Sequence, residues 1–236
     1  MLKAYLEPSE VQKLEEAAKH YRDKLLIRLL FHSGARISEI TSLKVNNVDF
    51  SRGTITILHL KSRIKLSCSG CGTRLGRNHM FCPKCGMKVN KVAIKEQEHR
   101  KMRVLPLDTG TLKMLADYIN RYCFSDQDAK NLLFNINRHR AWQIVRECAK
   151  SAGLPNLINP ETGKIHGISP YKLRDAFAVN AMKFDNTGDG LRMLQEHLGH
   201  ANFNTTAKYR KVSGDEHKDW YQKLWHDDPQ LKDTAD

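Results

Sequence analysis

Hydrophobic positions along this chain recur mostly at helical spacing. A short amphipathic helix is predicted from Ser9 to Lys19, and the apolar run that follows, from Arg22 to Phe31, is typical of a buried helix. Gly34 interrupts this pattern. Further helical segments are predicted at 36–43, 111–122, 138–152, 170–183, 190–198 and 205–209.

Two segments alternate instead between apolar and polar residues. Thr54 to Leu60 (TITILHL) predicts one strand, and Met102 to Leu107 predicts a second. The expected fold class is therefore mainly α with a small antiparallel β-sheet, of the α+β type. The segment 62–100 between the strands is far longer than a hairpin loop, which indicates an inserted module.

The domain organisation follows from these elements. One domain is expected over 1–213, interrupted by the insertion at 62–100. A tail over 214–236 carries Trp220, Leu224 and Trp225 at helical spacing.

Charge then narrows the choice of partner. The 236 residues carry a formal net charge of +13, with a pI near 9.5, which favours a polyanion such as nucleic acid and leaves a membrane surface as the alternative. From Lys61 to Arg103 there are twelve Lys or Arg residues against two acids, so this stretch holds +10 of the total. There is no run of 18 apolar residues and no signal-peptide pattern, so we expect a cytoplasmic protein without membrane contact.

The insertion contains a four-cysteine motif. Cys68 and Cys71 form one CxxC pair, Cys82 and Cys85 form another, and a glycine follows each pair. Four thiolates at this spacing can surround one tetrahedral zinc ion with no open position, which predicts a structural zinc in a ribbon-like module. The alternatives are a redox dithiol and a disulfide pair, the latter disfavoured in a reducing compartment. Such a centre carries about −2 itself, so the module remains basic.

Three further motifs each have an ordinary explanation when taken alone. They are GARISE at 34–39, SPYKLRDAFA at 169–178 and LGHANFNTTAKY at 198–209. Within them, Arg36 and Arg174 could be surface charges, His200 a cap beside a glycine, and Tyr209 a half-buried aromatic. Their order along the chain is more informative than any one of them.

Taken together, the motifs resemble those of the tyrosine recombinase and phage integrase family, in a Xer-like form. That family has an Arg box, a hairpin Lys, an H-x-x-R box, an L-G-H box and a terminal Tyr. The resemblance extends over Leu6 to Val212 and includes LEPSEV, the run at 22–50 and RKMRVLPL at 100–107. It implies a mostly helical catalytic domain with a small sheet near the active site.

The resemblance also implies roles for these residues. Arg36 and Arg174 would bind the non-bridging oxygens of a DNA phosphodiester, and Tyr209 would attack it to form a 3′-phosphotyrosyl link. His200 is implied as a base or phosphate ligand. The reaction needs no catalytic metal or nucleotide cofactor. Tyr171 stands where the H-x-x-R box usually has histidine, and a phenol donates a hydrogen bond but is no base near neutral pH.

Other positions remain open at this point. Lys61 fits the hairpin lysine that protonates the leaving oxygen, with Lys95 and Lys101 as competitors, and His166 could compensate for Tyr171. Glu39 is expected to support Arg36 by an ion pair, the alternative being a helix-surface pair. The candidate DNA-binding residues are Lys61, Arg63, Lys65, Arg100, Lys101 and Arg103.

Partners follow from the resemblance as well. Double-stranded DNA is expected, with self-association into a synaptic tetramer through the C-terminal segment and a nucleoid-associated location. The family's N-terminal domain, which completes a clamp on DNA, is not recognised in this chain, and the basic insertion is expected to take over part of that contact. Protein contact or simple ordering of the hairpin are alternatives for the insertion. The competing functions are a non-catalytic DNA-binding protein on this scaffold and an enzyme like type IB topoisomerase.

Overall fold

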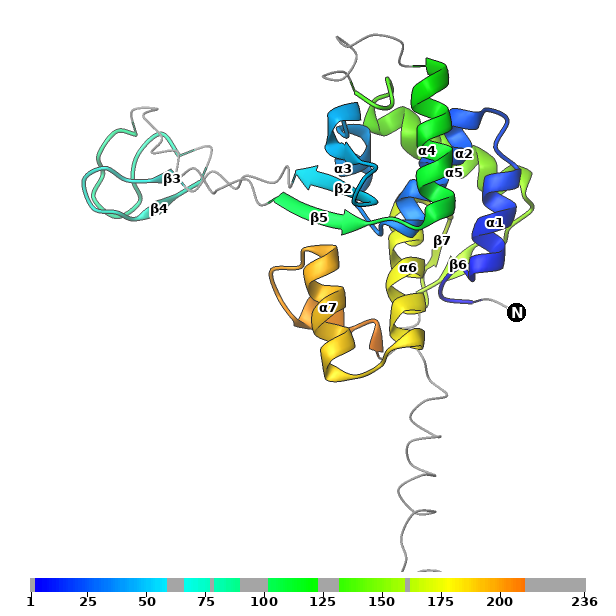
Figure 1. Cartoon of the computed structure of the whole chain (residues 1–236). Helices are drawn as coiled ribbons and strands as arrows, with labels where there is room; N and C mark the ends of the chain where they lie inside the picture. The colour runs from blue at the N-terminus through cyan, green and yellow to red at the C-terminus, as the bar shows by residue number, and fades with distance from the viewer. Residues whose placement is uncertain are drawn as a thin grey trace, which may run out of the picture. The chain divides into compact units, whose positions relative to one another are not determined.

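The structure is a computed structural model that describes residues 3–58, 66–76, 79–89, 102–122, 132–159 and 162–210 (Figure 1). The chain divides into two compact units, one formed by 1–57 with 104–236 and the other by 58–103. The insertion predicted at 62–100 falls within the range of the second unit.

The larger unit is mainly helical, which confirms the predicted fold class. Its helices are α1 (Pro8–Glu16), α2 (Tyr21–His32), α3 (Ile37–Thr41), the 3₁₀ turn η1 (Val45–Asn47), α4 (Thr109–Tyr122), α5 (Arg138–Ser151), α6 (Pro170–Phe184), α7 (Gly188–Leu198) and α8 (Asn204–Ala207). Each longer helix lies within a few residues of its predicted bounds. The spacing of hydrophobic residues therefore predicts most of the helices of this unit.

The core of the larger unit is built around α2, as its continuous apolar sequence predicts. This helix packs against α1, α4 and α6 (Figure 1). Its five aliphatic residues Leu25, Leu26, Ile27, Leu29 and Leu30 are fully buried. Burial of each such side chain stabilises the fold by roughly 1.5–3 kcal/mol, so α2 is a rigid base for the elements beside it.

A small sheet lies at the edge of this unit. It contains β1 (Val48–Asp49), β2 (Thr54–Leu58) and β5 (Met102–Pro106) in the order β1-β2-β5, and β1 pairs antiparallel with β2. Ile55 and Ile57 of β2 are buried while Thr54 and Thr56 are half-buried, as the alternation predicts.

A second, two-stranded pair was not expected from the sequence. It is formed by β6 (Leu157–Ile158) and β7 (Ile165–His166), which pair antiparallel. Strands of two residues are too short to show any alternation, so the pattern of the chain gives no signal for them.

The C-terminal helices form their own apolar cluster, and this cluster positions the site. Pro170 begins α6, and the Thr187 side chain caps α7 by accepting a hydrogen bond from the Gly190 amide. Residues of α6 and α7 bury a shared core that also includes the Tyr209 ring.

A network of charged side chains joins α1, α2 and the start of α4. Arg28 of α2 donates to Glu15 (3.2 Å), to Thr111 (3.0 Å) and to Asp108 (3.4 Å), and His32 contacts Asp108 at 2.7 Å. Asp108 also accepts from the Thr111 amide at 2.9 Å, which caps the N-terminus of α4. Burial opposes ionisation of Asp108, but hydrogen bonds from Thr111 and the charges of His32 and Arg28 lower its pKa to about 2.

The smaller unit has little regular structure in its described part. Its β3 (Leu66–Ser67) pairs antiparallel with β4 (Arg74–Leu75), and Phe81 forms an isolated bridge with Lys88. Across the described residues of the whole chain, the helices are too short or too polar to cross a membrane.

Candidate active site

Arg174 is the most deeply buried charged side chain among the predicted catalytic residues. It lies on α6 with 3% of its surface exposed. Its guanidinium donates from Nη1 to the Gly34 carbonyl (2.7 Å) and from Nη2 to the Leu198 carbonyl (2.8 Å) and His200 Nε2 (3.0 Å). A buried cation needs such acceptors, and these three hold the guanidinium in one orientation.

The Gly34 and Leu198 carbonyls that accept from Arg174 both lie at sharp turns of the backbone. Gly34 follows α2 with a φ of +56°, and a Cβ placed there would lie 2.5 Å from the Phe177 ring. Gly199 ends α7 in the left-handed conformation, with a φ of 64°. A side chain at Gly34 would be both strained and obstructed, so glycine is required for the approach of the first motif to α6.

The other predicted arginine, Arg36, follows Gly34 by two residues and lies just before α3. Its Nη1 contacts Glu39 Oε1 at 2.9 Å, and its amide donates to Glu39 Oε2 at 2.8 Å. Glu39 is 2% exposed. The Arg36–Glu39 pair is thus present in the structure, with the carboxylate buried and the guanidinium partly exposed.

His200 connects Arg174 to the last motif. Because a guanidinium only donates, the 3.0 Å contact makes His200 Nε2 an acceptor, so the ring proton is on Nδ1. Nδ1 lies 2.8 Å from the Thr206 hydroxyl, which accepts that proton's hydrogen bond. These two contacts together define one tautomer of the ring, with its proton on Nδ1.

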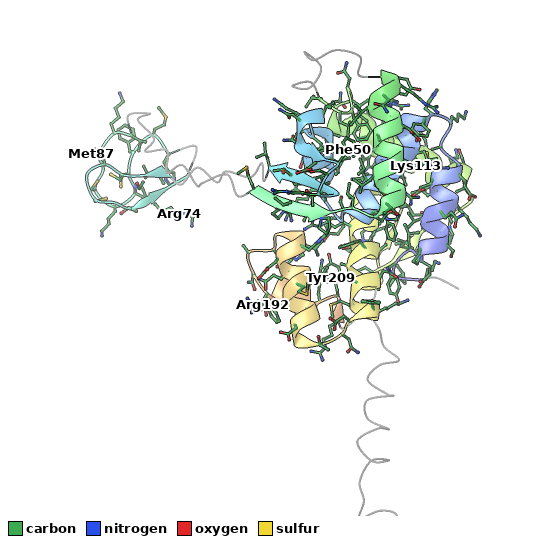
Figure 2. The ribbon with its side chains drawn as sticks, in the orientation of Figure 1. Phe50, Arg74, Met87, Lys113, Arg192 and Tyr209 are labelled. Carbon is green, nitrogen blue, oxygen red and sulfur yellow. The ribbon has the colours of Figure 1, made fainter. Side chains whose placement is uncertain are left out.

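Tyr209 lies beside α6 and α7, in the apolar cluster that these helices share (Figure 2). Its ring is stacked with the His200 ring at a centroid distance of 6.4 Å, and only 4% of the residue is exposed. The hydroxyl donates to Asp175 Oδ1 at 2.8 Å. Burial, together with the negative charge and hydrogen bond of Asp175, raises the pKa of the Tyr209 phenol well above its ordinary value.

Tyr171 has a different environment from the buried residues. It lies in the first turn of α6 and is 56% exposed. Its hydroxyl accepts from Lys208 Nζ at 3.0 Å, and the same ammonium lies 4.7 Å from the Tyr209 ring centroid. His166, the residue considered as its substitute, is exposed on β7.

Several predicted residues lie outside the part of the chain that the structure describes. These are Lys61, Arg63, Lys65, Lys95, Arg100, Lys101 and the tail residues Trp220, Leu224 and Trp225. Of the candidate DNA-binding residues, Arg103 is described, and it is half-buried on β5.

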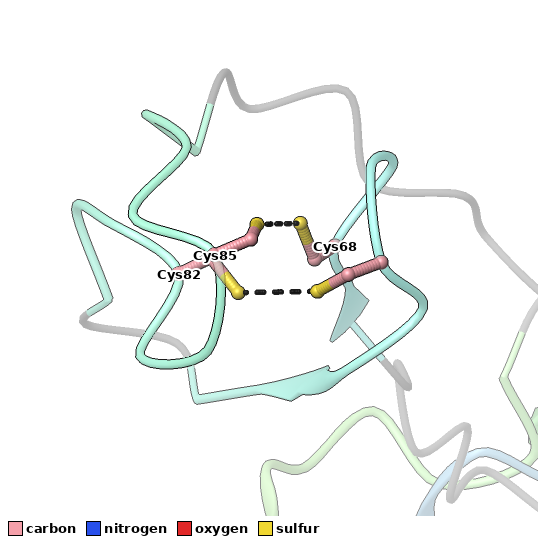
Figure 3. Close-up of side chains that lie close together, drawn as sticks. Cys68, Cys82 and Cys85 are labelled. Atoms are coloured by element: carbon pink, nitrogen blue, oxygen red, sulfur yellow. Dashed lines mark hydrogen bonds between the residues drawn. The ribbon is translucent and has the colours of Figure 1, made fainter.

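The four cysteines of the smaller unit converge on one point (Figure 3). Their sulfur atoms all lie within 4.8 Å of one another, with Cys68 and Cys85 at 3.6 Å and Cys71 and Cys82 at 3.5 Å. A tetrahedron of sulfurs around zinc, with bonds of about 2.3 Å, has edges of about 3.8 Å, so the set fits such an ion. Hydrogen bonds with the Thr73 hydroxyl and amide lower the pKa of the Cys71 thiol to about 6, which favours the thiolate that a metal binds.

Some residues of the site were not predicted from the sequence. Asp175 contacts the Tyr209 hydroxyl and pairs with Lys172, and Lys208 lies over the Tyr209 ring. Thr206 contacts His200 Nδ1. The one signal in the sequence was an acid directly after Arg174, and its contact with Tyr209 spans 34 residues of chain.

The helical domain with its small sheet, and the buried arginine and tyrosine joined through a half-buried histidine beside α6 and α7, define the catalytic-domain fold of tyrosine recombinases. The profile of the Phage integrase family matches residues 4–69 and 79–216. The chain belongs to the phage integrase family.

Individual relatives agree with this assignment. The chain is 26% identical over 217 residues to a tyrosine recombinase XerA of Pyrococcus horikoshii, a match covering 88% of this chain and 56% of the relative. It is 30% identical over 192 residues to a tyrosine recombinase XerD of Neisseria meningitidis, covering 81% of this chain and 51% of the relative. The chain thus spans little more than half the length of these relatives.

Solved structures show the same fold. A crystal structure of XerA recombinase superposes with a TM-score of 0.61 at 22% identity, covering 95% of this chain and 64% of that one. The XerH site-specific recombinase, in its post-cleavage complex with a palindromic difH substrate, gives 0.58 at 20% identity and covers 96% of this chain and 54% of that one.

Proposed function

We propose that this chain carries the catalytic site of a tyrosine-type site-specific DNA recombinase. The observation that carries the proposal is the continuous connection from Arg174 through His200 to Tyr209, within 3.0 Å for the first pair and in ring stacking for the second. Double-stranded DNA is the proposed substrate, which agrees with the chain's charge of +13 and with a place at the nucleoid.

The chemistry proceeds by one substitution at phosphorus. Tyr209 Oη attacks the scissile phosphate, the new O–P bond forms as the bond to the 5′ oxygen breaks, and the phenol proton passes to His200, the base that the resemblance implies, or to water. Guanidiniums of Arg36 and Arg174 bind the non-bridging oxygens and stabilise the charge that develops on them. The product is a 3′-phosphotyrosyl link and a free 5′-hydroxyl, and attack by a 5′-hydroxyl reverses the step.

The proton that the leaving oxygen needs comes from a lysine in this proposal. Lys61 follows β2 in the chain and is the favoured donor, and Lys95 and Lys101 are its competitors. Tyr171, half-exposed beside Lys208, is proposed as a hydrogen-bond donor to the bound phosphate in place of the usual histidine.

The remaining partners are also proposals. We infer that the four cysteines hold a structural zinc, supported by the convergence of their sulfurs, and that the basic insertion contacts DNA phosphates. Self-association on DNA through 214–236 is proposed from the resemblance, and a relative, lambda integrase, has been solved as a dimer bound to a core site.

A covalent-adduct assay tests the catalytic proposal. The protein is mixed with DNA carrying its recombination site, denatured and separated by size. A DNA-linked protein band is expected for the wild type and none for Tyr209→Phe, while native binding of the two proteins is equal. Native binding without any adduct in the wild type would instead support a non-catalytic DNA-binding protein, a function with which the buried Tyr209 hydroxyl agrees.

A further inference from the structure

The carboxylate of Asp175 belongs to none of the predicted catalytic roles, yet it contacts the nucleophile directly. Its Oδ1 accepts the Tyr209 hydroxyl at 2.8 Å, and its Oδ2 lies 3.5 Å from Lys172 Nζ. The Asp175 side chain is 14% exposed. Each oxygen of the carboxylate therefore has its own partner, Tyr209 for Oδ1 and Lys172 for Oδ2.

The Tyr209 ring is restrained on its other surfaces as well. Lys208 Nζ lies 4.7 Å from the ring centroid and donates to the Tyr171 hydroxyl, and the His200 ring stacks alongside. Only 4% of the residue is exposed, so little of its surface is open to a phosphodiester. This position is closed with respect to the proposed reaction.

The charge of Asp175 adds to this closure. A scissile phosphate is an anion, and a carboxylate at hydrogen-bond distance from the attacking oxygen repels it. A phenol that donates to a carboxylate keeps its lone pairs free, so this hydrogen bond does not itself prevent attack. It holds the hydroxyl in the buried position, and it must break if the hydroxyl is to move out toward a bound phosphate.

We propose that Asp175 is a positioning residue for the nucleophile, whose carboxylate holds the Tyr209 hydroxyl in the closed position until bound DNA withdraws it. This inference rests on the proposed function. The competing role for Asp175 is a general base that takes the phenol proton during attack. The two roles predict opposite effects when the charge is removed.

Asp175→Asn is the variant that separates these roles. Asparagine keeps the size and a weaker acceptor but loses the charge, so the closed position is destabilised. At saturating DNA in a single turnover, we expect adduct formation about tenfold faster than in the wild type. This is roughly the factor by which losing a hydrogen bond to a charged group would shift the equilibrium away from the closed position. Asp189→Asn, an exposed carboxylate on α7, is the matched control and should leave the rate unchanged. A slower rate would assign Asp175 as a base, and an equal rate would equally overturn the proposal.

A second measurement needs neither DNA nor turnover. Phenolate absorbance is titrated in the wild type and in Asp175→Asn, each compared with the same protein carrying Tyr209→Phe, so that the difference reports Tyr209 alone. The charged or titratable groups around this phenol are Asp175, Tyr171 and Arg174 on α6, with His200 and Lys208 beside the ring. Loss of the carboxylate should move the Tyr209 midpoint to lower pH, and an unmoved midpoint would contradict the proposal.

The two readouts also separate this inference from the proposed function. If neither protein forms an adduct on its DNA, the proposed function fails, while the titration still decides whether Asp175 holds the phenol. Asp175→Ala removes the acceptor altogether and should shift both readouts in the same direction. Far-ultraviolet circular dichroism of each variant shows whether the fold is retained.

Discussion

Among single residues, Arg174 determines most of the site's geometry. Its three hydrogen bonds join the turn after α2, the end of α7 and His200, so one buried guanidinium connects three motifs that are distant in sequence. A lysine at this position offers one ammonium without the planar fork, and it cannot reach all three acceptors in their present places.

Replacement of Arg174 by lysine should therefore affect both rate and stability. We expect adduct formation to fall on the order of 10²-fold or more, because a donor to the developing phosphate charge is removed. The free energy of unfolding should fall by about 2–3 kcal/mol, because buried carbonyls are left without a charged donor. Single-turnover kinetics and thermal denaturation measure the two effects.

The control for this variant is Arg192→Lys on α7. The Arg192 side chain is 74% exposed and pairs with Glu196 along the helix surface, so its replacement should change neither quantity measurably. A full rate in Arg174→Lys would remove that guanidinium from the proposed reaction.

The sequence predicted some of these residue-level features and not others. Arg174, His200 and Tyr209 were identified through their motifs, and the structure brings them together. The contact of Asp175 with Tyr209 depends on how α8 returns beside α6 and could not follow from residue spacing. The His200 tautomer likewise depends on which partner occupies Nε2, which is a property of the folded site.

At the level of elements, the charged network joining α1, α2 and α4 gives the fold a pH dependence. The pKa of Asp108 is held at about 2, below the roughly 3.9 of an unfolded aspartate. Its contribution to stability is thus fully present above about pH 4 and disappears as the pH falls toward 2. His32 acts in the same direction, because burial lowers its pKa and its neutral form is favoured in the folded state.

Asp108→Asn tests this network. The Asp108 side chain is 40% exposed, so after allowance for solvent screening we expect a loss of about 1 kcal/mol at pH 7. Urea unfolding at several pH values should show this difference shrinking toward zero near pH 2. A difference that stays constant over this range would show that the carboxylate's charge does not contribute.

The elements themselves were predicted to different degrees. The long helices follow from their 3.6-residue pattern, and β2 follows from strict alternation. The pair β6 and β7 has strands of only two residues, which are too short to show any periodicity.

For the whole molecule, the most distinctive part is the cysteine-rich insertion, which lies in the chain between β2 and β5. Its described part holds four converging thiols and no acidic residue, so the candidate metal site and basic charge occur in the same unit. The two CxxC pairs were readable from spacing alone, whereas the function of the unit is not encoded in any pattern of the chain.

Removal of Cys68 to Cys85 tests the role of the insertion. The wild type should contain one zinc ion per chain and this variant none. If the insertion binds phosphates, DNA affinity should fall, and the slope of log K against log salt should flatten by about 0.9 for each phosphate that is no longer bound. An unchanged slope would favour the alternative in which the insertion binds protein or orders the hairpin.

In the proposed reaction, Tyr209 becomes covalently linked to DNA. Mass spectrometry of the adduct after nuclease and protease digestion measures this most directly, because it locates the nucleotide on a peptide. We expect a nucleotide attached through a 3′ phosphate to the peptide containing Tyr209. A nucleotide on any other residue, or cleaved DNA with no peptide attached, would contradict it.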